Sequence, residues 1–238
     1  LMKRLILSMV AVCLAWGASA TVVLPKILGS NMVMQQSADV KLWGKCDADK
    51  SVTVVVSWAK GKIKTKADDK GNWSVVVSTP AGSYDKHTIT ISDGEELVLE
   101  NVMFGDVWVC AGQSNMEMPM KGYYNCPVEN AQAYICAPAA KEKIRMFTVP
   151  LRQTYEPQDM TEGSWKGAEP STVPEMSATA FFFARRLNEM LDVPVGIVSC
   201  AYGGARIESW TPKEILQTYP DEDLRVETIE AMTPSLRP

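Results

Sequence analysis

Between Leu24 and Val102 the chain alternates apolar and polar residues over short runs that are separated by turn residues. Such alternation is typical of strands that bury one face. Turns at 69–72 (Asp-Lys-Gly-Asn) and 92–95 (Ser-Asp-Gly-Glu) each join two runs as a hairpin would. Because strand patterns recur about every 8 to 12 residues, we expect an antiparallel β-sandwich over residues 21–102. The expected strands are 40–43, 52–58, 62–66, 73–77, 88–92 and 97–102.

After Val102 the pattern changes to continuous apolar runs, which are typical of parallel strands buried on both faces. These runs lie at 107–111, 144–149 and 195–201. An amphipathic helix is expected over 177–191, between Pro174 and Pro194. Strands that alternate with a helix predict an α/β domain, here over residues 103–238. The apolar stripe expected to face the core comprises Ala180, Phe183, Ala184, Leu187 and Leu191.

A serine follows the first of these apolar strands, in the sequence Gly112-Gln113-Ser114-Asn115-Met116. Ligands of open α/β sheets bind beyond the carboxyl ends of the strands, so Ser114 is a candidate nucleophile. The alternative is a plain strand-to-helix turn in which Ser114 or Asn115 caps the next helix. A second strand ends in the same way, with Gly203-Gly204 close behind it. Glycine allows a backbone N–H to approach a developing negative charge, and the alternative is a tight turn that binds no ligand.

These two segments, Gly-Gln-Ser-Asn-Met and Cys-Ala-x-Gly-Gly-x-x-Ile-Glu-x-Trp, resemble the sialate O-acetylesterase family of SGNH-type serine esterases. The resemblance implies that Ser114 is the nucleophile and that Gly203 or Gly204 supplies an oxyanion donor. It also implies a flavodoxin-like sheet after an N-terminal β-domain. Glu117 matches the first motif, as do Gln113 and Asn115, and these side chains are expected to hold the serine turn by hydrogen bonds. Arg206 and Glu208 belong to the second motif, and Arg206 could pair with a substrate carboxylate.

Serine needs a base to become a nucleophile, and the chain contains a single histidine, His87. His87 lies in an alternating segment of the expected sandwich, where a strand position is the simpler interpretation. In the resembling family the catalytic Asp and His lie further along than this chain extends, so we expect the esterase domain to be incomplete at its C-terminus. On this view a helical region at 221–232 is cut short, and the last strand of the sheet presents an unpaired edge.

The N-terminus has the three regions of a secretory signal. Lys3 and Arg4 precede an apolar stretch, and Ala18-Ser19-Ala20 is a small-residue cleavage site, so residues 1–20 are expected to be removed. The apolar stretch is shorter than the ~20 residues that span a bilayer, which argues against a membrane anchor after cleavage. We therefore expect a secreted or periplasmic protein.

The charge and the cysteine and histidine content bear on nucleic-acid binding, metal binding and disulfides. The net charge is −4 and no basic block occurs, so nucleic acid is not an expected partner. Neither a Cys-x-x-Cys pair nor a second histidine is present, and no metal or other cofactor is expected. An exported protein can keep disulfides, and Cys126 with Cys136 is the expected local pair. Oligomeric state is left open.

The sequence as a whole favours an exported carbohydrate O-acetylesterase that removes acetyl esters from sialic acid through Ser114. A close alternative is an acetylxylan esterase or another glycan deacetylase, because acetyl chemistry does not fix the sugar. A different alternative is a non-catalytic glycan-binding module. Tryptophans 43, 58 and 73 could form a sugar platform there, although their spacing along strands is more typical of a core.

Overall fold

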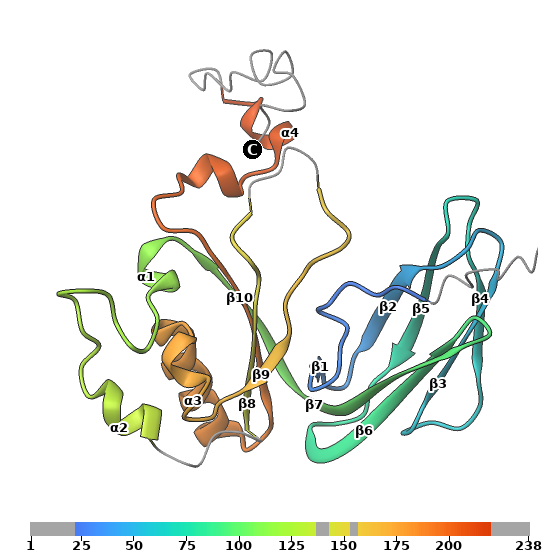
Figure 1. The fold of residues 1–238 in the computed structure, drawn as a ribbon, viewed down its shortest axis with the longest axis horizontal. Helices are drawn as coiled ribbons and strands as arrows, with labels where there is room; N and C mark the ends of the chain where they lie inside the picture. Colours follow the sequence, from blue (N-terminus) through green and yellow to red (C-terminus); the bar gives the residue numbers. More distant parts are fainter. Residues whose placement is uncertain (1–21, 137–142, 153–156, 220–238) are drawn as a thin grey trace, which may run out of the picture.

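The computed structural model describes residues 22–136, 143–152 and 157–219 (Figure 1). The expected leader at 1–20 and the helical region at 221–232 lie outside the described residues. Two parts stand side by side in the ribbon, one built of strands and the other of strands and helices. The strands are β1 (Val33–Gln35), β2 (Asp39–Lys45), β3 (Ser51–Val56), β4 (Ile63–Lys66), β5 (Asn72–Ser78), β6 (Ser83–Ser92), β7 (Glu96–Gly112), β8 (Ile144–Thr148), β9 (Trp165–Gly167) and β10 (Val195–Ala201). The helices are α1 (Ser114–Glu117), α2 (Ala131–Cys136), α3 (Ala178–Leu191), α4 (Lys213–Leu216) and the 3-10 turns η1 (Val173–Glu175) and η2 (Ile207–Trp210).

The N-terminal part consists of two sheets. Strands β4, β3, β6 and β7 pair in that order and are antiparallel, while β2 and β5 form a separate two-stranded antiparallel sheet. Side chains from both sheets share one buried cluster, which includes Leu42 of β2, Val54 of β3 and Ile89 of β6. The six expected strands are present. A full β-sandwich stays a prediction, since the second sheet holds only β2 and β5 among the described residues.

Strand β7 runs through both parts of the molecule without a break (Figure 1). Its first half pairs with β6, and Val33 of β1 pairs with Met103 in a parallel register. From Asp106 onward β7 pairs with β10. The expected domain boundary after Val102 therefore falls inside a strand, and the division into domains stays a prediction.

The α/β part has the strand order β7–β10–β8–β9, in which the first three strands are parallel and β9 is antiparallel to β8. A flavodoxin-like sheet would place the first strand between the second and the third, whereas here β10 lies in the middle. The prediction that the last strand has an unpaired edge is wrong, because β10 is paired on both sides. Among the described residues, β7 over 106–112 is paired on one side only, and β9 forms the opposite edge.

Strands β8 and β10 are buried on both faces, as their continuous apolar runs predicted. The prediction is wrong for the run at 107–111 in β7, where Trp108 and Val109 are 45% and 68% exposed and only Cys110 is buried. Phe147 and Val198 face the N-terminal sheets and join their buried cluster. The neighbouring residues Met146 and Ile197 face the other way and pack in a second cluster with residues of α3.

Helix α3 lies in the expected range between Pro174 and Pro194, although it begins at Ala178 and not at Ser177. Ser177 is the N-cap and accepts a hydrogen bond from the Ala180 amide at 3.2 Å. The expected apolar stripe is wrong in two places, because Phe181 and Asn188 are buried whereas Phe183 and Leu191 are 38% and 48% exposed. Asn188 can be buried because its amide donates to the Val193 carbonyl at 2.7 Å and to the Tyr84 hydroxyl at 2.9 Å.

A buried arginine joins the two parts. Arg145 of β8 is 3% exposed, and its guanidinium donates to the carbonyls of Asn31 and Asn101 at 3.0 and 2.6 Å and to the Asn101 side chain at 2.9 Å. Asn101 lies in β7 with a φ of 55°. These bonds tie β8 to the first half of β7 and to the loop before β1.

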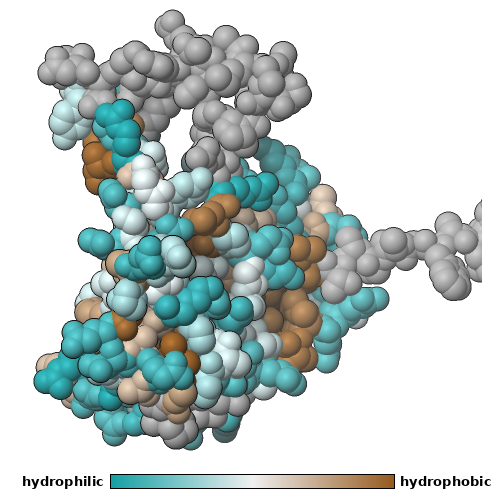
Figure 2. Space-filling view, turned by 60° about the vertical axis from the view of Figure 1, so that its left-hand side comes forward, coloured by the Kyte–Doolittle hydropathy of each residue, from teal (hydrophilic) through white to brown (hydrophobic). Residues whose placement is uncertain are grey.

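On the face that Figure 2 shows, apolar residues form separate groups between hydrophilic ones. Within the described residues no helix is long and apolar enough to cross a membrane.

Candidate active site

The candidate nucleophile lies at the carboxyl end of β7. That strand ends at Gly112, and Ser114 is the first residue of the short helix α1, with its side chain exposed. Gly112 has a φ of 159°, and a Cβ atom there would approach the Cβ of Met116 to 3.1 Å. The turn is therefore tight.

The second motif is brought beside the first by parallel pairing. Ala201, the last residue of β10, pairs with Gly112, and the Tyr202 amide donates to the Gly112 carbonyl at 2.9 Å. The Gly203-Gly204 turn comes directly after this point. Two segments that lie some ninety positions apart in the chain thus meet at one end of the sheet, as the sequence predicted for parallel strands.

Glu117 fastens the two motifs together. Its Oε2 atom accepts a hydrogen bond from the Gly203 amide at 2.6 Å. A Cβ atom on Gly203 would collide with that same oxygen and would lie 3.8 Å from the Ser114 Cα. A side chain at this position would therefore push the Glu117 carboxylate away, and Glu117 holds the turn by a hydrogen bond, as expected from the motif. We call this contact between Glu117 and Gly203 the clasp.

The two glycines proposed as oxyanion donors differ in this structure. The Gly203 amide is engaged by Glu117. Gly204 has a φ of 78°, a Cβ placed on it would meet nothing within 4 Å, and its amide has no acceptor among the described residues. The geometry favours Gly204 over Gly203 as a donor beside Ser114, and this assignment stays a prediction.

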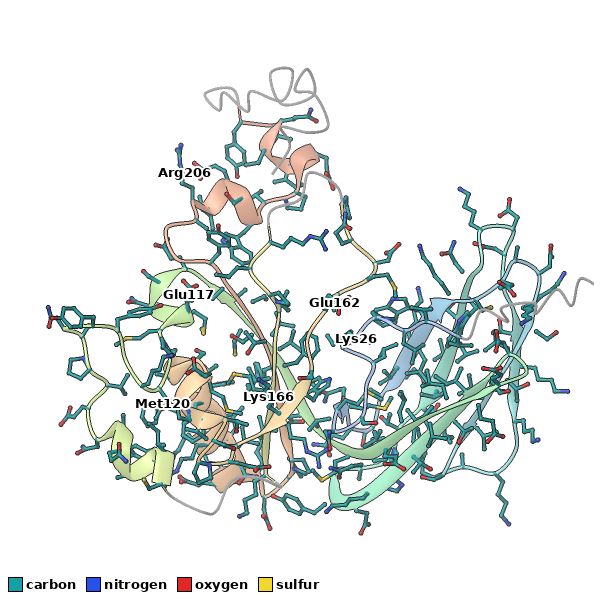
Figure 3. The ribbon with its side chains drawn as sticks, in the orientation of Figure 1. Lys26, Glu117, Met120, Glu162, Lys166 and Arg206 are labelled. Carbon is teal, nitrogen blue, oxygen red and sulfur yellow. The ribbon has the colours of Figure 1, made fainter. Side chains whose placement is uncertain are left out.

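The other motif residues take supporting or exposed positions. Gln113 donates through its side-chain amide to the Ala205 carbonyl at 3.3 Å, which is a second tie between the motifs. Asn115 has an exposed side chain, and its carbonyl accepts from the Thr179 hydroxyl at 3.0 Å. Arg206 pairs with Glu208 at 3.0 Å while its side chain stays 80% exposed. Figure 3 shows Arg206 on the loop beyond β10, at the same end of the sheet as Glu117.

Two residues that sequence reasoning missed contribute to this region. Ser177 donates through its hydroxyl to the Met116 carbonyl at 2.6 Å and so anchors α1 on the start of α3. Burial and the charge of Glu117 raise the pKa of Tyr123, which places this phenol in the neighbourhood of the clasp. Ser177 was expected only as the first residue of the helix, and its contact with α1 is a tertiary one. Tyr123 lies in an irregular connection that carries no motif.

The single histidine of the chain lies away from Ser114. His87 belongs to β6, its Nδ1 atom is 3.2 Å from the Ser57 hydroxyl, and its ring packs against Trp58 and Phe104. The expectation that His87 is a strand residue in the N-terminal part is confirmed. Within the described residues, Ser114 therefore has no histidine beside it.

The cysteines do not form the expected pair, since Cys126 and Cys136 are both free and exposed. Cys110 and Cys200 lie on β7 and β10 below the motifs, and burial raises the pKa of both thiols. In the part of the chain that the structure describes, no group of three or more His, Cys, Asp or Glu side chains is arranged to hold a metal ion.

Comparisons with known proteins agree with this geometry. A family model described as carbohydrate esterase, sialic acid-specific acetylesterase, matches residues 104–232, which is more than half of the chain. The chain belongs to this family. Among curated members, the sialate O-acetylesterase of Rattus norvegicus is 30% identical over 224 residues, covering 87% of this chain and 40% of that protein. That of Homo sapiens is 27% identical over 201 residues, covering 77% and 38%.

A solved structure is similar to most of this chain. The crystal structure of a carbohydrate acetylesterase from Xanthomonas citri superposes with a TM-score of 0.76 at 30% identity, covering 82% of this chain and 43% of that one. The chain spans about 40% of the length of the relatives it matches. The family match begins at Phe104, within β7, and includes the clasp and Ser114.

Proposed function

We propose that this chain carries the nucleophile and the oxyanion-binding turn of an exported carbohydrate O-acetylesterase. The observation that carries the proposal is the placement of Ser114 at the carboxyl end of β7, where the clasp holds the Gly203-Gly204 turn beside it. Family membership and the names of the relatives point to acetyl esters of carbohydrates, with sialic acid as the first candidate sugar. Acetylated xylan or another glycan is the close alternative.

In the proposed reaction the Ser114 Oγ attacks the acetyl carbonyl carbon, and the carbonyl oxygen takes up negative charge. The amides of Ser114 and Gly204 are the donors that would stabilise this charge. Collapse of the intermediate releases the sugar hydroxyl and leaves an acetylated Ser114, which water then hydrolyses to acetate. Each half of the reaction needs a base and an acid. His87 is held in the N-terminal part, so the described residues supply no histidine for these steps.

Chemical rescue with imidazole tests the proposal directly. We expect the chain to show no serine-dependent turnover of 4-nitrophenyl acetate by itself, because a missing base reduces serine hydrolases to roughly 10³- to 10⁴-fold over water. Added imidazole should restore acetylation of Ser114, which mass spectrometry of the peptide containing Ser114 would detect. The S114A variant measures the background reaction of imidazole with the ester. If wild type and S114A are acetylated equally, or at another residue, Ser114 is not the nucleophile.

Acetate release from O-acetylated sialic acid and from acetylated xylan, measured under the same rescue, separates the two sugar candidates. Faster Ser114-dependent release from one of them names the substrate class.

Export is a separate part of the proposal and rests on the sequence of residues 1–20. The purified extracellular or periplasmic protein should begin near Thr21. An intact N-terminus on a cytosolic product would contradict it.

A further inference from the structure

Two neighbouring tyrosines lie in a short hairpin of the connection between α1 and α2. The backbones of Tyr123 and Cys126 exchange two hydrogen bonds of 3.0 Å each, which closes the hairpin over Tyr124 and Asn125. Asn125 has a φ of 61°, and asparagine is one of the few residues that adopt this conformation readily in a turn. Tyr124 is 94% exposed, whereas Tyr123 is 45% exposed. The same hairpin therefore holds one tyrosine in solvent and the other partly against the protein.

Buried contacts fix the position of this hairpin. The Met120 amide donates to the Met176 carbonyl at 2.8 Å, and the Met120 side chain is fully buried in the cluster that contains residues of α3. Figure 3 shows Met120 below Glu117. The chain then reverses at Gly122, which has a φ of 77° and where a Cβ atom would lie 2.7 Å from the Cys126 carbonyl oxygen. The hairpin is thus held between the core and the end of α1.

Tyr123 lies within electrostatic reach of the clasp. Burial, and after it the negative charge of Glu117, raise the pKa of the Tyr123 phenol. Glu117 in turn binds the Gly203 amide at 2.6 Å, and a Cβ atom on Gly203 would lie 3.8 Å from the Ser114 Cα. Because its pKa is raised, the phenol keeps its proton at neutral and weakly alkaline pH, and its hydroxyl can both donate and accept a hydrogen bond. A half-exposed ring with a polar tip therefore borders the candidate active site.

The proposed reaction needs a contact for the alcohol part of the ester. The acetyl group is small, and its carbonyl oxygen is bound by the amides of Ser114 and Gly204, so the alcohol must extend from these amides into the mouth of the site. Small-molecule sites are lined mainly by aromatic and apolar side chains with a few polar groups. Tyrosine provides both, because its ring is apolar and its hydroxyl is polar. A sugar ring matches this side chain, since its C–H face is apolar and its edge carries hydroxyl groups.

We propose that Tyr123 binds the sugar ring of the acetyl ester, with its phenol ring against the apolar face of the sugar and its hydroxyl bonded to a sugar hydroxyl. This inference rests on the proposed function and adds a residue that determines specificity. An ester whose alcohol has no ring would gain much less from Tyr123. Tyr124, which is almost fully exposed at the tip of the same hairpin, takes no part in the contact.

Kinetics with esters of different alcohols test this contact under imidazole rescue. Acetate release is measured with O-acetylated sialic acid and acetylated xylan, and acetylation of Ser114 by vinyl acetate is the reference without a ring. Y123A should raise KM for the preferred acetylated sugar about tenfold and change kcat less than about threefold. Its loss of kcat/KM should be at least about fivefold larger with that sugar than with vinyl acetate. Y123F keeps the ring and should raise KM only about threefold, and the matched control Y124A should stay within about twofold of wild type.

Three results would overturn the inference. These are an unchanged KM for both acetylated sugars in Y123A, equal changes in Y123A and Y124A, and an equal loss with sugars and with vinyl acetate, which would mean that Tyr123 only supports the clasp. If Y123A does not fold, Y123L is compared in its place.

Failure of the proposed function would look different, because vinyl acetate would then leave Ser114 of the wild-type chain unmodified. Binding of unacetylated sialic acid and of xylohexaose is in that case measured by ligand-observed NMR. Weaker binding of either sugar by Y123A than by Y124A supports the contact with Tyr123, and equal binding by the two variants overturns it.

Discussion

Removing the Glu117 carboxylate tests whether the clasp organises the candidate active site. Its bond to the Gly203 amide is short, at 2.6 Å, and the acceptor is a charged group. Hydrogen bonds to charged groups contribute about 1.5 to 3 kcal/mol, and the half-buried position of Glu117 favours the lower end of this range. E117A should therefore lower the free energy of unfolding by about 1.5 kcal/mol, which corresponds to a fall in Tm of about 3 to 6 °C. E117Q keeps a neutral acceptor and should lose about half as much.

The effect on chemistry should exceed the effect on stability. Gly203 lies against Ser114, so a turn freed from the clasp moves the oxyanion donors relative to the nucleophile. A displacement of about 1 Å in a catalytic group costs roughly 10²-fold in rate. We expect E117A to slow imidazole-dependent acetylation of Ser114 by about 30- to 100-fold and E117Q by less than about tenfold.

The assay follows acetylation of Ser114 in single turnovers and records Tm by calorimetry for each variant. E175A is the matched control, because Glu175 pairs with Lys121 at 2.8 Å on the surface, with both side chains more than half exposed. Exposed ion pairs contribute about 0 to 1 kcal/mol, so this variant should keep its acetylation rate. Equal losses in E117A and E175A would refute the reasoning. If E117A fails to fold, the acetylation rates of wild type and E117Q are compared instead. An E117Q rate equal to that of wild type would then contradict a role for the clasp.

Two further predictions follow from buried groups. R145M should lower the free energy of unfolding by about 3 kcal/mol in denaturant titration, because the Asn31 and Asn101 carbonyls lose a donor in a buried setting; a change below about 1 kcal/mol would contradict this. Burial raises the pKa of the Cys110 and Cys200 thiols, so their thiolate fraction at pH 8 is lower than that of an unperturbed cysteine and grows only at higher pH. Iodoacetamide should therefore modify exposed Cys126 first at pH 8, and faster labelling of Cys110 would contradict the prediction.

Local patterns predicted the separate elements of this fold well. Strand β10 has the predicted bounds, β8 ends one residue early, and α3 begins one residue later than predicted. Each of these rests on short-range information, such as a proline before or after the element or a run of apolar residues. Hydrophobic periodicity predicted the buried face of α3 incorrectly, because several neighbouring positions are apolar. Three phenylalanines stand in succession at 181–183, so apolar spacing alone could not tell which one faces the core.

The continuity of β7 and the order of the strands could not be predicted from local sequence patterns. Between Val102 and Val107 the residues typical of turns are Gly105 and Asp106, and the change of pattern there was interpreted as the start of a new domain. In the structure a Cβ at Gly105 would collide with the Pro194 carbonyl, so this glycine serves a close approach of two chain segments inside a continuous strand. Strand order, with β10 in the centre, depends on pairings between segments far apart in the chain. Those pairings leave no local signature.

In the candidate site, too, some features were predictable from the motifs and others depend on tertiary contacts. Motif order predicted that Ser114 and the glycine turn lie at one end of the sheet, because parallel strands carry their carboxyl ends to the same edge. The choice between Gly203 and Gly204 needed the register, since pairing of Ala201 with Gly112 is what brings Gly203 onto Glu117. If β10 were shifted by one residue against β7, Gly204 would take the place of Gly203 beside Glu117. The roles of Ser177 and Tyr123 likewise depend on tertiary contacts.

The continuity of β7 makes the expected boundary at residue 102 testable. A chain that begins at Met103 keeps Ser114 and the pairing with β10, but it loses β6 and β1 from the first half of the strand and the donor contacts of Arg145 to Asn31 and Asn101. It also exposes Phe147 and Val198, which pack among the N-terminal sheets. Burying such a side chain contributes about 1.5 to 3 kcal/mol, so these losses approach the whole stability of a typical domain. We therefore expect residues 103–238 expressed alone to show no cooperative unfolding by calorimetry, whereas residues 21–238 should unfold cooperatively. A cooperative transition in the shorter chain would establish the boundary that the sequence suggested, and it would mean that the strand end carrying Ser114 is supported by β10 and α3 alone.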